Sequence, residues 1–535
     1  MNDSARLAHL VVEHLLQVGV QHAVLAPGSR NAPLSFALAG AADAGLLALH
    51  TRIDERTAGF LALGIAKSSR RPVAVVTTSG TGTANLHPAV LEAAHAGVPL
   101  VVVTADRPAA LRGTGANQTT DQVRLFGGAP AGFADVAWPL TEADDTALKV
   151  ALGGHQRGPV HLNVQLTEPL VPDPADTPEF HGRGTSGQSD HRKPVSLPLG
   201  PRTVVVAGDD SGNRARLLAE QAHWPLLAEP TSGSRNGTMP IRTYRLLLGT
   251  ELGDRIQRAV VLGHPTLSRP VSRLLAREDV EVVSVRDRGR WSSRPFPVAA
   301  EHHAVAVEAA DVREWTDRWR TTDAALGGRI DAFVAARPEL TPYEVAAAVS
   351  AAVPPNGLLF VGASNPIRDL DLMARPYPVG ERRLLLANRG LAGIDGTLSS
   401  AIGAVLGRPH TSRALLYVGD VTFLHDLTGL VIGPAEQRPD LTVVVANDDG
   451  GSIFATLEQG APEHAASYDQ LFGTPHGLDL GSLCAALRVP HWRVTDRAEL
   501  EHALASPNGG IEVVEAVVRR DNRRELDAAL RALAG

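Results

Sequence analysis

The sequence contains one cysteine, Cys484, in 535 residues. A single cysteine cannot close an intrachain disulfide or supply a cysteine-rich metal site, so both kinds of scaffold are excluded. The sequence also lacks an apolar run near the roughly 20 residues that a membrane-spanning helix requires. Its first residues, MNDSARLAHLVVEHLLQVGV, mix polar and apolar side chains, unlike a secretory signal. We therefore expect a cytoplasmic protein without a membrane span.

Lysine is scarce as well, since it occurs only at Lys67, Lys149 and Lys193, and nearly every cation is an arginine. An isolated arginine therefore indicates little, and only arginines that stand beside other signals become candidates. The formal net charge of −7 is modest for this length and gives no general attraction to nucleic acid. We expect small-molecule partners and no nucleic-acid partner.

A chain of 535 residues is too long for one hydrophobic core and suggests about three domains. Short aliphatic runs that end in turn residues alternate with helical patterns, which is typical of parallel sheets covered by helices on both faces. The prediction is an α/β fold of three doubly wound parallel-sheet domains in series. We expect a first domain at 1–175, a Pro- and Gly-rich linker at 176–200, a middle domain at 201–335 and a last domain at 336–535.

Polar motifs follow many of the apolar runs. Ligands of open parallel sheets bind beyond the carboxyl ends of the strands, so a site is expected at these motifs: PGSRN, DER, TSGTGTAN, TADRP, GASN, NRG, GD and NDDGG. Glycine, asparagine and aspartate also suit ordinary strand-to-helix turns, and each motif alone is compatible with a structural role.

Two of these motifs end successive predicted strands about one helix apart. Asp420 follows the first strand, Asn447 and Asp448 follow the second, and Gly450 lets the backbone approach a ligand closely. Neighbouring parallel strands lie about 5 Å apart, so the two acids can share one divalent cation. Mg²⁺ prefers such carboxylate oxygens together with phosphate oxygens. Two unrelated helix N-caps are the alternative interpretation.

A Gly-Asp pair, a strand-and-helix interval and an Asn-Asn-like pair ahead of glycine resemble the diphosphate motif of thiamine-diphosphate enzymes. The resemblance implies thiamine diphosphate and Mg²⁺ (or Mn²⁺) as cofactors, with the metal held by Asp420, Asp448 and Gly450. The sequence departs from the family pattern at Val421, where glycine is usual, and at Asp448, where a second asparagine is usual. Asn447 stays open as an alternative ligand. The cofactor-binding residues implied are Glu55, Gly80, Ile394, Gly419, Asp420, Ile453 and Phe454.

The resemblance also implies an acid that activates this cofactor. In the family a carboxyl group hydrogen-bonds the pyrimidine N1′ and favours the tautomer that removes the C2 proton. Glu55 opens a helix after a strand and precedes TSGTGTAN, at the position of this catalytic glutamate. Asp54 and Arg56 flank it as rivals. A glutamate at a helix N-terminus is, taken alone, more often a capping charge.

Several ordered motifs across nearly the whole chain resemble one branch of these enzymes: APGSRNAPL, TADRP, GANQTTDQ, GASNPIRDLD, NRGLAGIDG and NDDGGSIF. That branch is the family of 2-succinyl-5-enolpyruvyl-6-hydroxy-3-cyclohexene-1-carboxylate synthases of menaquinone biosynthesis. The resemblance implies decarboxylation of 2-oxoglutarate on thiamine diphosphate and addition of the resulting succinyl-semialdehyde carbanion to isochorismate. It also implies a homodimer or a dimer of dimers with active sites between chains.

Both implied substrates carry two carboxylates, and guanidinium groups hold carboxylates bidentately. Arginines follow strand-end motifs at positions that the family uses for its anionic substrates, although Arg269 aligns more loosely. Ile394 matches the residue that props the cofactor in its bent shape, and Ile453 and Phe454 would wall the reacting carbon. The implied substrate-binding residues are Ser29, Arg30, Arg107, Gln118, Arg269, Ser364, Arg368 and Arg389.

Two rival functions stand beside this one. An acetolactate synthase-like carboligase or decarboxylase would carry FAD on its middle domain, but no GxGxxG turn follows a strand there. The arginine set also favours dicarboxylates over pyruvate. A non-catalytic binding protein with the same fold would need neither Glu55 nor the acids Asp420 and Asp448. The sequence therefore favours the synthase, with a middle domain that binds no cofactor.

Overall fold

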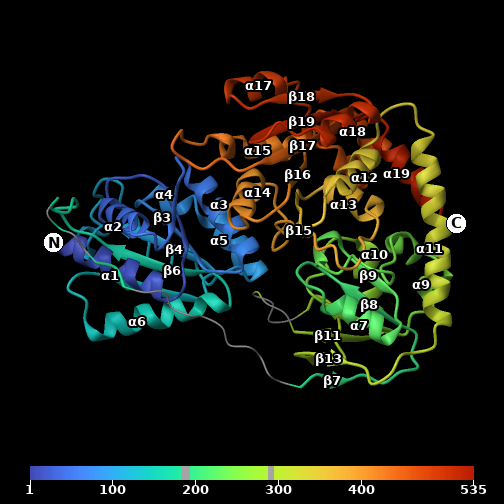
Figure 1. The fold of residues 1–535 in the computed structure, drawn as a ribbon, viewed down its shortest axis with the longest axis horizontal. Coiled ribbons are helices and arrows are strands. Elements are labelled where there is room, and N and C mark those ends of the chain that lie inside the picture. Colours follow the sequence, from blue (N-terminus) through green and yellow to red (C-terminus); the bar gives the residue numbers. More distant parts are fainter. Residues whose placement is uncertain (175, 177–178, 182–192, 287–288, 290–293) are drawn as a thin grey trace.

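The computed structural model describes residues 1–535 apart from 175, 177–178, 182–192, 287–288 and 290–293. Three large parallel sheets follow one another along the described chain, and each forms a unit with its helices (Figure 1). We call these the N-terminal, middle and C-terminal units. The predicted α/β fold is confirmed. The domain limits stay predictions, and part of the predicted linker 176–200 lies outside the described residues.

The N-terminal unit contains a six-stranded sheet in the order β2-β1-β3-β4-β6-β5, with neighbouring strands parallel. The central strands are aliphatic and buried, as expected where helices cover both faces. The strands are β1 His22–Leu25, β2 Ala48–Thr51, β3 Val73–Thr77, β4 Leu100–Asp106, β5 Gly132–Val136 and β6 Val160–Gln165. The helices are α1 Asp3–Gln17, α2 Ala32–Asp43, α3 Glu55–Ser69, α4 Thr81–Ala84, α5 His87–Ala96 and α6 Glu142–Gly153.

The C-terminal unit repeats this strand order as β15-β14-β16-β17-β19-β18. Its strands are again parallel, which brings the carboxyl ends of β16 and β17 side by side. The strands are β14 Leu358–Val361, β15 Leu384–Leu386, β16 Ala414–Gly419, β17 Leu441–Asn447, β18 His491–Val494 and β19 Ile511–Val517. The helices are α12 Pro342–Ala352, α13 Asn365–Met373, α14 Thr397–Leu406, α15 Asp420–His425, α16 Ala465–Tyr468, α17 Leu480–Ala486, α18 Arg497–Ala505 and α19 Arg523–Ala532.

The middle unit has a five-stranded sheet in the order β12-β11-β10-β8-β9 and a two-stranded sheet of β7 and β13. The long helix α11, yellow in Figure 1, leads from this unit to the C-terminal unit and packs its buried face into a core that both share. The strands are β7 Val195–Ser196, β8 Thr203–Ala207, β9 Leu226–Ala228, β10 Arg258–Leu262, β11 Glu281–Val285, β12 Ala300–His302 and β13 Val305–Ala306. The helices are α7 Arg214–Ala222, α8 Tyr244–Leu247, α9 Glu251–Asp254, α10 Arg269–Leu275 and α11 Glu314–Ala335.

The N-terminal and C-terminal units meet where α3 packs against α14 (Figure 1). The two helices are rich in glycine and alanine and are buried over most of their length. A Cβ at Gly64 would overlap the carbonyl oxygen of Ser400, and a Cβ at Gly403 would overlap that of Leu61. The two backbones are therefore in direct contact, and hydrophobic residues of both units form one core.

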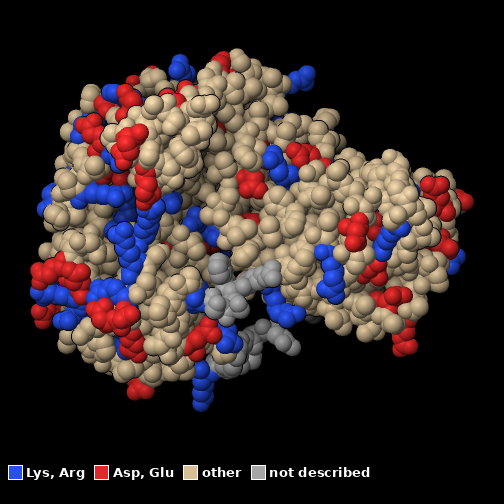
Figure 2. All heavy atoms as spheres, turned by 180° about the vertical axis from the view of Figure 1, so that it is seen from behind, with Lys and Arg blue, Asp and Glu red and all other residues tan. Residues whose placement is uncertain are grey.

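The surface carries charges of both signs. Lys and Arg side chains lie among Asp and Glu side chains over the face shown in Figure 2. Several of the exposed arginines pair with a nearby acid, as Arg286 does with Glu301 at 2.9 Å. In the described chain, no helix is both long enough and apolar enough to cross a membrane.

The α3–α14 contact predicts that Gly403→Ala destabilises the protein. The added methyl group overlaps backbone atoms of α3, and overpacking of this kind typically costs about 1–3 kcal/mol. Gly328→Ala in α11 is the matched control, because no heavy atom lies within 4 Å of its Cβ position. Helix propensity favours that control change by up to about 1 kcal/mol. Thermal unfolding should show a lower midpoint for Gly403→Ala only; equal midpoints would contradict the packing.

Candidate active site

The ends of β16 and β17 bring together the acidic strand-end motifs. Gly419 lies opposite Ala446 in the parallel register, so Asp420 and the 447–450 turn share one edge of the sheet. Asp420 is buried, and its Oδ2 accepts the N–H of Gly450 at 2.8 Å. Gly450 has a φ of 142° and no room for a Cβ beside Gly473. Asp420 and the backbone of Gly450 are therefore neighbours, as the sequence predicted.

Asp448 shares this edge. Burial raises the pKa of Asp448 to about 7, and the negative charge of Asp420 adds to the shift. Burial also raises the pKa of Asp420, although N–H groups of Gly450 and Val421 counteract it. Neither carboxyl group forms an ion pair with an arginine or lysine of the described residues. Two close acids of this kind suit a divalent cation.

Asn447, the alternative ligand, is engaged elsewhere. Its Nδ2 donates to Glu515 Oε1 at 2.6 Å, and its Oδ1 accepts the N–H of Asp449 at 3.0 Å. Both amide atoms thus have protein partners, which favours Asp448 over Asn447 as a ligand. Within the described ranges, no three His, Cys, Asp or Glu side chains gather as a metal cluster, so the candidate donors are two carboxylates and a backbone carbonyl.

His476 is a residue of this corner that the sequence did not point to. Its Nε2 lies 3.2 Å from Asp420 Oδ2, and its backbone N–H donates to Asp449 Oδ1 at 3.1 Å. It follows Asp420 by 56 positions, in a loop without a recognisable motif. No pattern in the sequence would have placed it beside the acid pair.

Glu55 is the first residue of α3, and its two rivals are occupied. Asp54 is the N-cap, whose side chain accepts the N–H groups of Arg56 and Thr57. Arg56 donates to the carbonyl of His425 at 2.9 Å. The Glu55 carboxylate instead faces the loop after β3, where a Cβ at Gly82 would lie 2.9 Å from its Oε1. Because Asp54 already caps the helix, Glu55 is not needed as a capping charge.

Candidate residues of the N-terminal unit gather beside this loop. Arg107 is buried and donates to Ser79 Oγ and, at 2.8 Å, to the carbonyl of Gln118. Burial, followed by the charge of Arg30, lowers the pKa of Arg107. Gln118 Nε2 donates to the carbonyl of Ser79 at 3.0 Å. The remaining candidates here are Gly80, whose N–H donates to Gln122 Oε1, and Ser29, which is exposed and lies next to Arg30.

A second group of candidate arginines lies in the C-terminal unit. Arg389 is 4% exposed, and its Nη2 donates to Thr266 Oγ1 at 2.9 Å, while its Nε has no partner. Among the residues that the structure describes, Arg368 donates only to the Ser364 carbonyl, at 3.4 Å. Burial, and then the charges of Arg389 and Arg245, lower the pKa of Arg368. Among the described residues, neither Arg368 nor Arg389 forms an ion pair with a carboxylate.

One buried acid of the middle unit lies within electrostatic reach of Arg389. Burial raises the pKa of Glu229 to about 8, although the charge of Arg389 opposes this shift. At neutral pH Glu229 is therefore largely protonated and does not neutralise the arginine. An anionic ligand would be the counter-charge of Arg389.

Arg269 is not brought into either group. Its side chain is 65% exposed and pairs with Glu458, which is 73% exposed, at 2.9 Å. Exposed pairs of this kind contribute little energy. No hydrogen bond or ion pair in the described part of the chain joins Arg269 to another candidate, although Thr266, three residues earlier, contacts Arg389.

The apolar candidates are partly exposed at the same edge of the C-terminal unit. Ile394 lies in the loop before α14, and its carbonyl accepts the Thr397 hydroxyl at 3.0 Å. Ile453 and Phe454 follow the acidic turn, and the Phe454 ring lies 5.7 Å from that of Phe472. These side chains can contact an apolar part of a ligand next to the acid pair.

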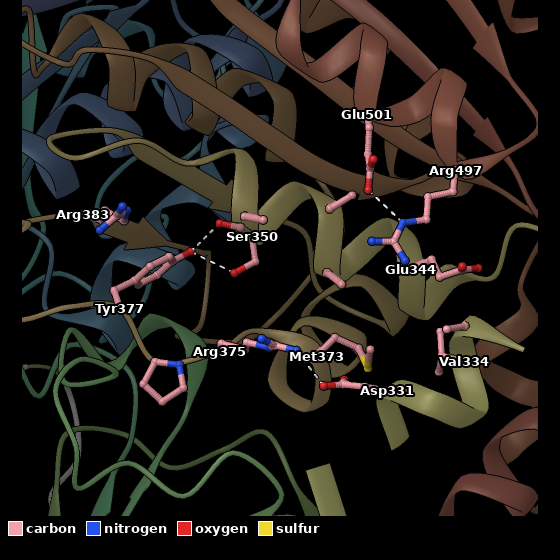
Figure 3. Close-up of a pocket in the computed structure, with 15 residues that line it drawn as sticks. Asp331, Val334, Glu344, Ser350, Met373, Arg375, Tyr377, Arg383, Arg497 and Glu501 are labelled. Carbon is pink, nitrogen blue, oxygen red and sulfur yellow. Dashed lines mark hydrogen bonds and ion pairs between the residues drawn. The ribbon is translucent and has the colours of Figure 1, made fainter. Parts of the chain in front are cut away.

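A cavity of about 530 Å³ lies elsewhere, between the end of α11, α12 and α18. Figure 3 shows two pairs of charged side chains that face one another there, Arg375 with Asp331 and Arg497 with Glu501. None of the candidate site residues lines it. The cavity is therefore separate from the candidate active site.

Comparison with known proteins agrees with this geometry. Residues 5–125 match the model of the thiamine pyrophosphate enzyme N-terminal TPP binding domain, and residues 371–516 match that of the C-terminal TPP binding domain. The two matches fall on the N-terminal and C-terminal units, and they place the chain among the thiamine pyrophosphate enzymes.

Relatives narrow this class. The chain is 64% identical to the 2-succinyl-5-enolpyruvyl-6-hydroxy-3-cyclohexene-1-carboxylate synthase of Nocardioides sp., over 98% of this chain and 97% of the relative. It is 47% identical to the synthase of the same name from Kineococcus radiotolerans and 44% identical to that of Nocardia farcinica, in each case over at least 99% of both chains. The chain belongs to this synthase family.

The acid pair predicts a pH-dependent stability. An unfolded aspartic acid has a pKa of about 4, whereas that of folded Asp448 is about 7. Between these values the folded protein binds more protons than the unfolded chain, so the free energy of unfolding falls as the pH rises. Asp448→Asn should flatten this fall in thermal unfolding of the cofactor-free protein with a chelator. Asp521→Asn, at an exposed position, should leave the fall unchanged. If stability falls with pH as steeply in Asp448→Asn as in wild type, the raised pKa of Asp448 is refuted.

Proposed function

We propose that the protein decarboxylates 2-oxoglutarate with thiamine diphosphate as cofactor and adds the remaining four-carbon unit to isochorismate. The products are 2-succinyl-5-enolpyruvyl-6-hydroxy-3-cyclohexene-1-carboxylate and CO₂. The observation that carries this proposal is the pair of partly buried Arg368 and buried Arg389, whose only partners among the described residues are a carbonyl and a hydroxyl. Both substrates are dianions that such cations fit, and the names of the relatives support the same reaction.

An acetolactate synthase-like carboligase is the weaker alternative. Pyruvate has a single carboxylate, which leaves part of the two arginine groups without a counter-charge. The three relatives compared above carry the synthase name over essentially their whole length. The arginines and the relatives therefore support the dicarboxylate substrates.

The residues after β16 and β17 fit a metal-bound diphosphate. Asp420 and Asp448 are neighbouring acids whose pKa values burial raises, and neither has a lysine or arginine partner in the described ranges; Asp420 also holds the Gly450 backbone beside it. We propose that they bind Mg²⁺, or Mn²⁺, together with the Gly450 carbonyl. When bound, thiamine diphosphate would act as the electron sink for decarboxylation. Its proposed contacts are Glu55, Gly80, Ile394, Gly419, Ile453 and Phe454.

Glu55 is proposed to share a proton with the pyrimidine ring of the cofactor. Its carboxylate faces the segment of Gly80 and Gly82 after β3, where its Oε1 occupies the space that a Cβ at Gly82 would need. Asp54 and Arg56 keep their caps and interdomain contacts and take no part. Glu55 is therefore the proposed catalytic acid.

The arginines are proposed to hold the substrate carboxylates. Arg107 and Arg389 are assigned mainly to isochorismate. Arg30 adds positive charge in the N-terminal unit, and Arg368 adds positive charge in the C-terminal unit. Ser29, Gln118 and Ser364 supply hydroxyl and amide groups from the segments after β1, β4 and β14. Arg269 is kept as a candidate whose exposed pair with Glu458 would have to open first.

We further propose that the complete site forms between two copies of the chain. Glu55 and the acid pair lie in different units, and no hydrogen bond or ion pair of the described residues links them. Beside the site, Ile53 is 71% exposed and Leu391 is 52% exposed, which supports cover by a partner. The proposed assembly is a homodimer or a dimer of dimers in the cytoplasm. The proposed domains are 1–175, 201–335 and 336–535.

The two half-reactions test the function. With cofactor, Mg²⁺ and 2-oxoglutarate, the protein should release at most one CO₂ per site rapidly, and added isochorismate should restore turnover and yield the product by mass spectrometry. Arg389→Ala should raise the isochorismate KM by about 10- to 150-fold, the worth of one charge-assisted bond, and should change CO₂ release much less. Exposed Arg286→Ala is the control. Rapid CO₂ release from pyruvate alone would contradict the assignment.

Glu55→Gln should fold and bind cofactor but lose most turnover. An amide still meets the ring nitrogen but cannot share a proton with it as a carboxyl group does. NMR of the cofactor's C2 proton should show exchange with deuterium slowed by orders of magnitude. Asp54→Asn, which alters the helix cap and the contact with Thr428 but leaves Glu55 in place, should leave exchange nearly unchanged. Normal exchange in Glu55→Gln would clear this residue of the role.

Shared sites predict complementation between two impaired chains. Glu55→Gln and Arg389→Ala chains, mixed and reassembled, should form dimers in which one site has both native residues. Activity at low isochorismate should therefore exceed that of either variant alone. If each site used residues of a single chain, mixing would restore nothing.

A further inference from the structure

The segment Ala387–Leu391, which carries Arg389, is held by buried side chains of the N-terminal unit. Glu92 lies on α5 and is 4% exposed. Its Oε1 accepts the N–H of Gly390 and its Oε2 accepts the N–H of Leu391, both at 2.7 Å. One carboxylate thus fixes the two peptide groups that directly follow Arg389.

Lys67 holds the same segment from its other end. Its Nζ donates to the carbonyl of Ala387 and lies 3.6 Å from Asp209 of the middle unit. Lys67 is buried near the end of α3. Since Arg389 itself donates to Thr266, all three units meet around this arginine.

The backbone of the segment rests directly on α5. A Cβ at Gly390 would lie 2.6 Å from the carbonyl oxygen of Glu92 and 2.9 Å from the backbone nitrogen of Ala96. Only glycine permits this approach. The approach in turn lets the N–H groups of residues 390 and 391 reach the carboxylate together.

Packing alone does not explain a buried glutamate at position 92. Among the described residues it forms no ion pair, and its hydrogen bonds come from neutral N–H groups alone. Burial of a carboxylate without a cation is unfavourable. A glutamine would present its NH₂ group to one of the two N–H donors. What a carboxylate alone provides is two acceptor atoms for two adjacent donors, which fixes a geometry.

We propose that Glu92, assisted by Lys67, is a positioning residue for Arg389. It fixes the backbone beside Arg389, so that the guanidinium keeps the orientation in which it binds a substrate carboxylate. This inference rests on the proposed assignment of Arg389 to isochorismate. If the segment loosens, only a fraction of molecules has the arginine in place, and apparent affinity falls by that fraction. The effect should therefore appear in isochorismate binding, with little change in CO₂ release.

Glu92→Gln tests this proposal through a double-mutant cycle. Alone, it should raise the isochorismate KM about tenfold, within the range of one charge-assisted bond, while CO₂ release from 2-oxoglutarate and cofactor affinity stay near wild type. Combined with Arg389→Ala it should add little, because residues that act through one another are not additive. Lys67→Met should act in the same direction.

Asp323→Asn controls for a general loss of stability. The Asp323 carboxylate likewise accepts two consecutive N–H groups, those of Arg242 and Thr243, but within the middle unit. This variant should lower the thermal midpoint about as much as Glu92→Gln and should leave the isochorismate KM unchanged.

Hydrogen exchange of the cofactor-free protein gives a readout independent of activity. In Glu92→Gln the amides of residues 390 and 391 should exchange faster than in wild type. Unchanged exchange, or a KM effect that adds fully to that of Arg389→Ala, would overturn the positioning role. If Arg389→Ala leaves the isochorismate KM unchanged, the substrate assignment itself is overturned, and this inference with it. If Arg389→Ala raises the isochorismate KM and Glu92→Gln does not, only this inference is overturned.

Discussion

The backbone contact between α3 and α14 is the constraint on which the candidate site depends. The helices approach until no Cβ fits at Gly64 or Gly403, and close-packed interiors leave no slack for sliding. α3 carries Glu55 at its first residue and Lys67 near its last, while α14 directly follows the loop of Arg389 and Ile394. A shift of one helix along the other would displace all of these groups together.

The site also keeps opposite charges apart instead of pairing them. Asp420 and Asp448 lie at the ends of β16 and β17, whereas Arg368 on α13 and Arg389 after β15 have, among the described residues, only a carbonyl and a hydroxyl as partners. Buried charges without counter-charges destabilise a free protein. A cation between the two acids and a dianion on the two arginines would supply the missing counter-charges and offset both destabilising effects. Ligand binding should therefore stabilise the fold by more than the contact area between ligand and protein alone would give. Ligands that bind only the native state add to its stability.

Sequence reasoning found the parts of this site that follow from strand order. Parallel strands end at one edge of a sheet, so Asp420 and Gly450 were expected to meet, and the strand-end motifs pointed to Arg30, Arg107, Arg368 and Arg389 as candidates. The sequence did not indicate the roles of His476 and Glu92, because a side chain that bonds across 56 or 298 positions leaves no periodic signal. Glu92 on a helix looks like any solvated glutamate. The cap of α3 was also undecided until the structure gave that role to Asp54.

The supports of Arg389 bear on how two sites would communicate. In the proposed dimer, Glu55 of one chain serves a site whose Arg368 and Arg389 come from its partner, yet Lys67 and Glu92 hold the segment around Arg389 in their own chain. Glu55 and Lys67 are twelve residues apart on α3, about 18 Å along a rigid helix. Each N-terminal unit therefore contacts both sites, one through its catalytic acid and one through its positioning residues. A ligand that shifts α3 at the first site must move the support of the arginine at the second.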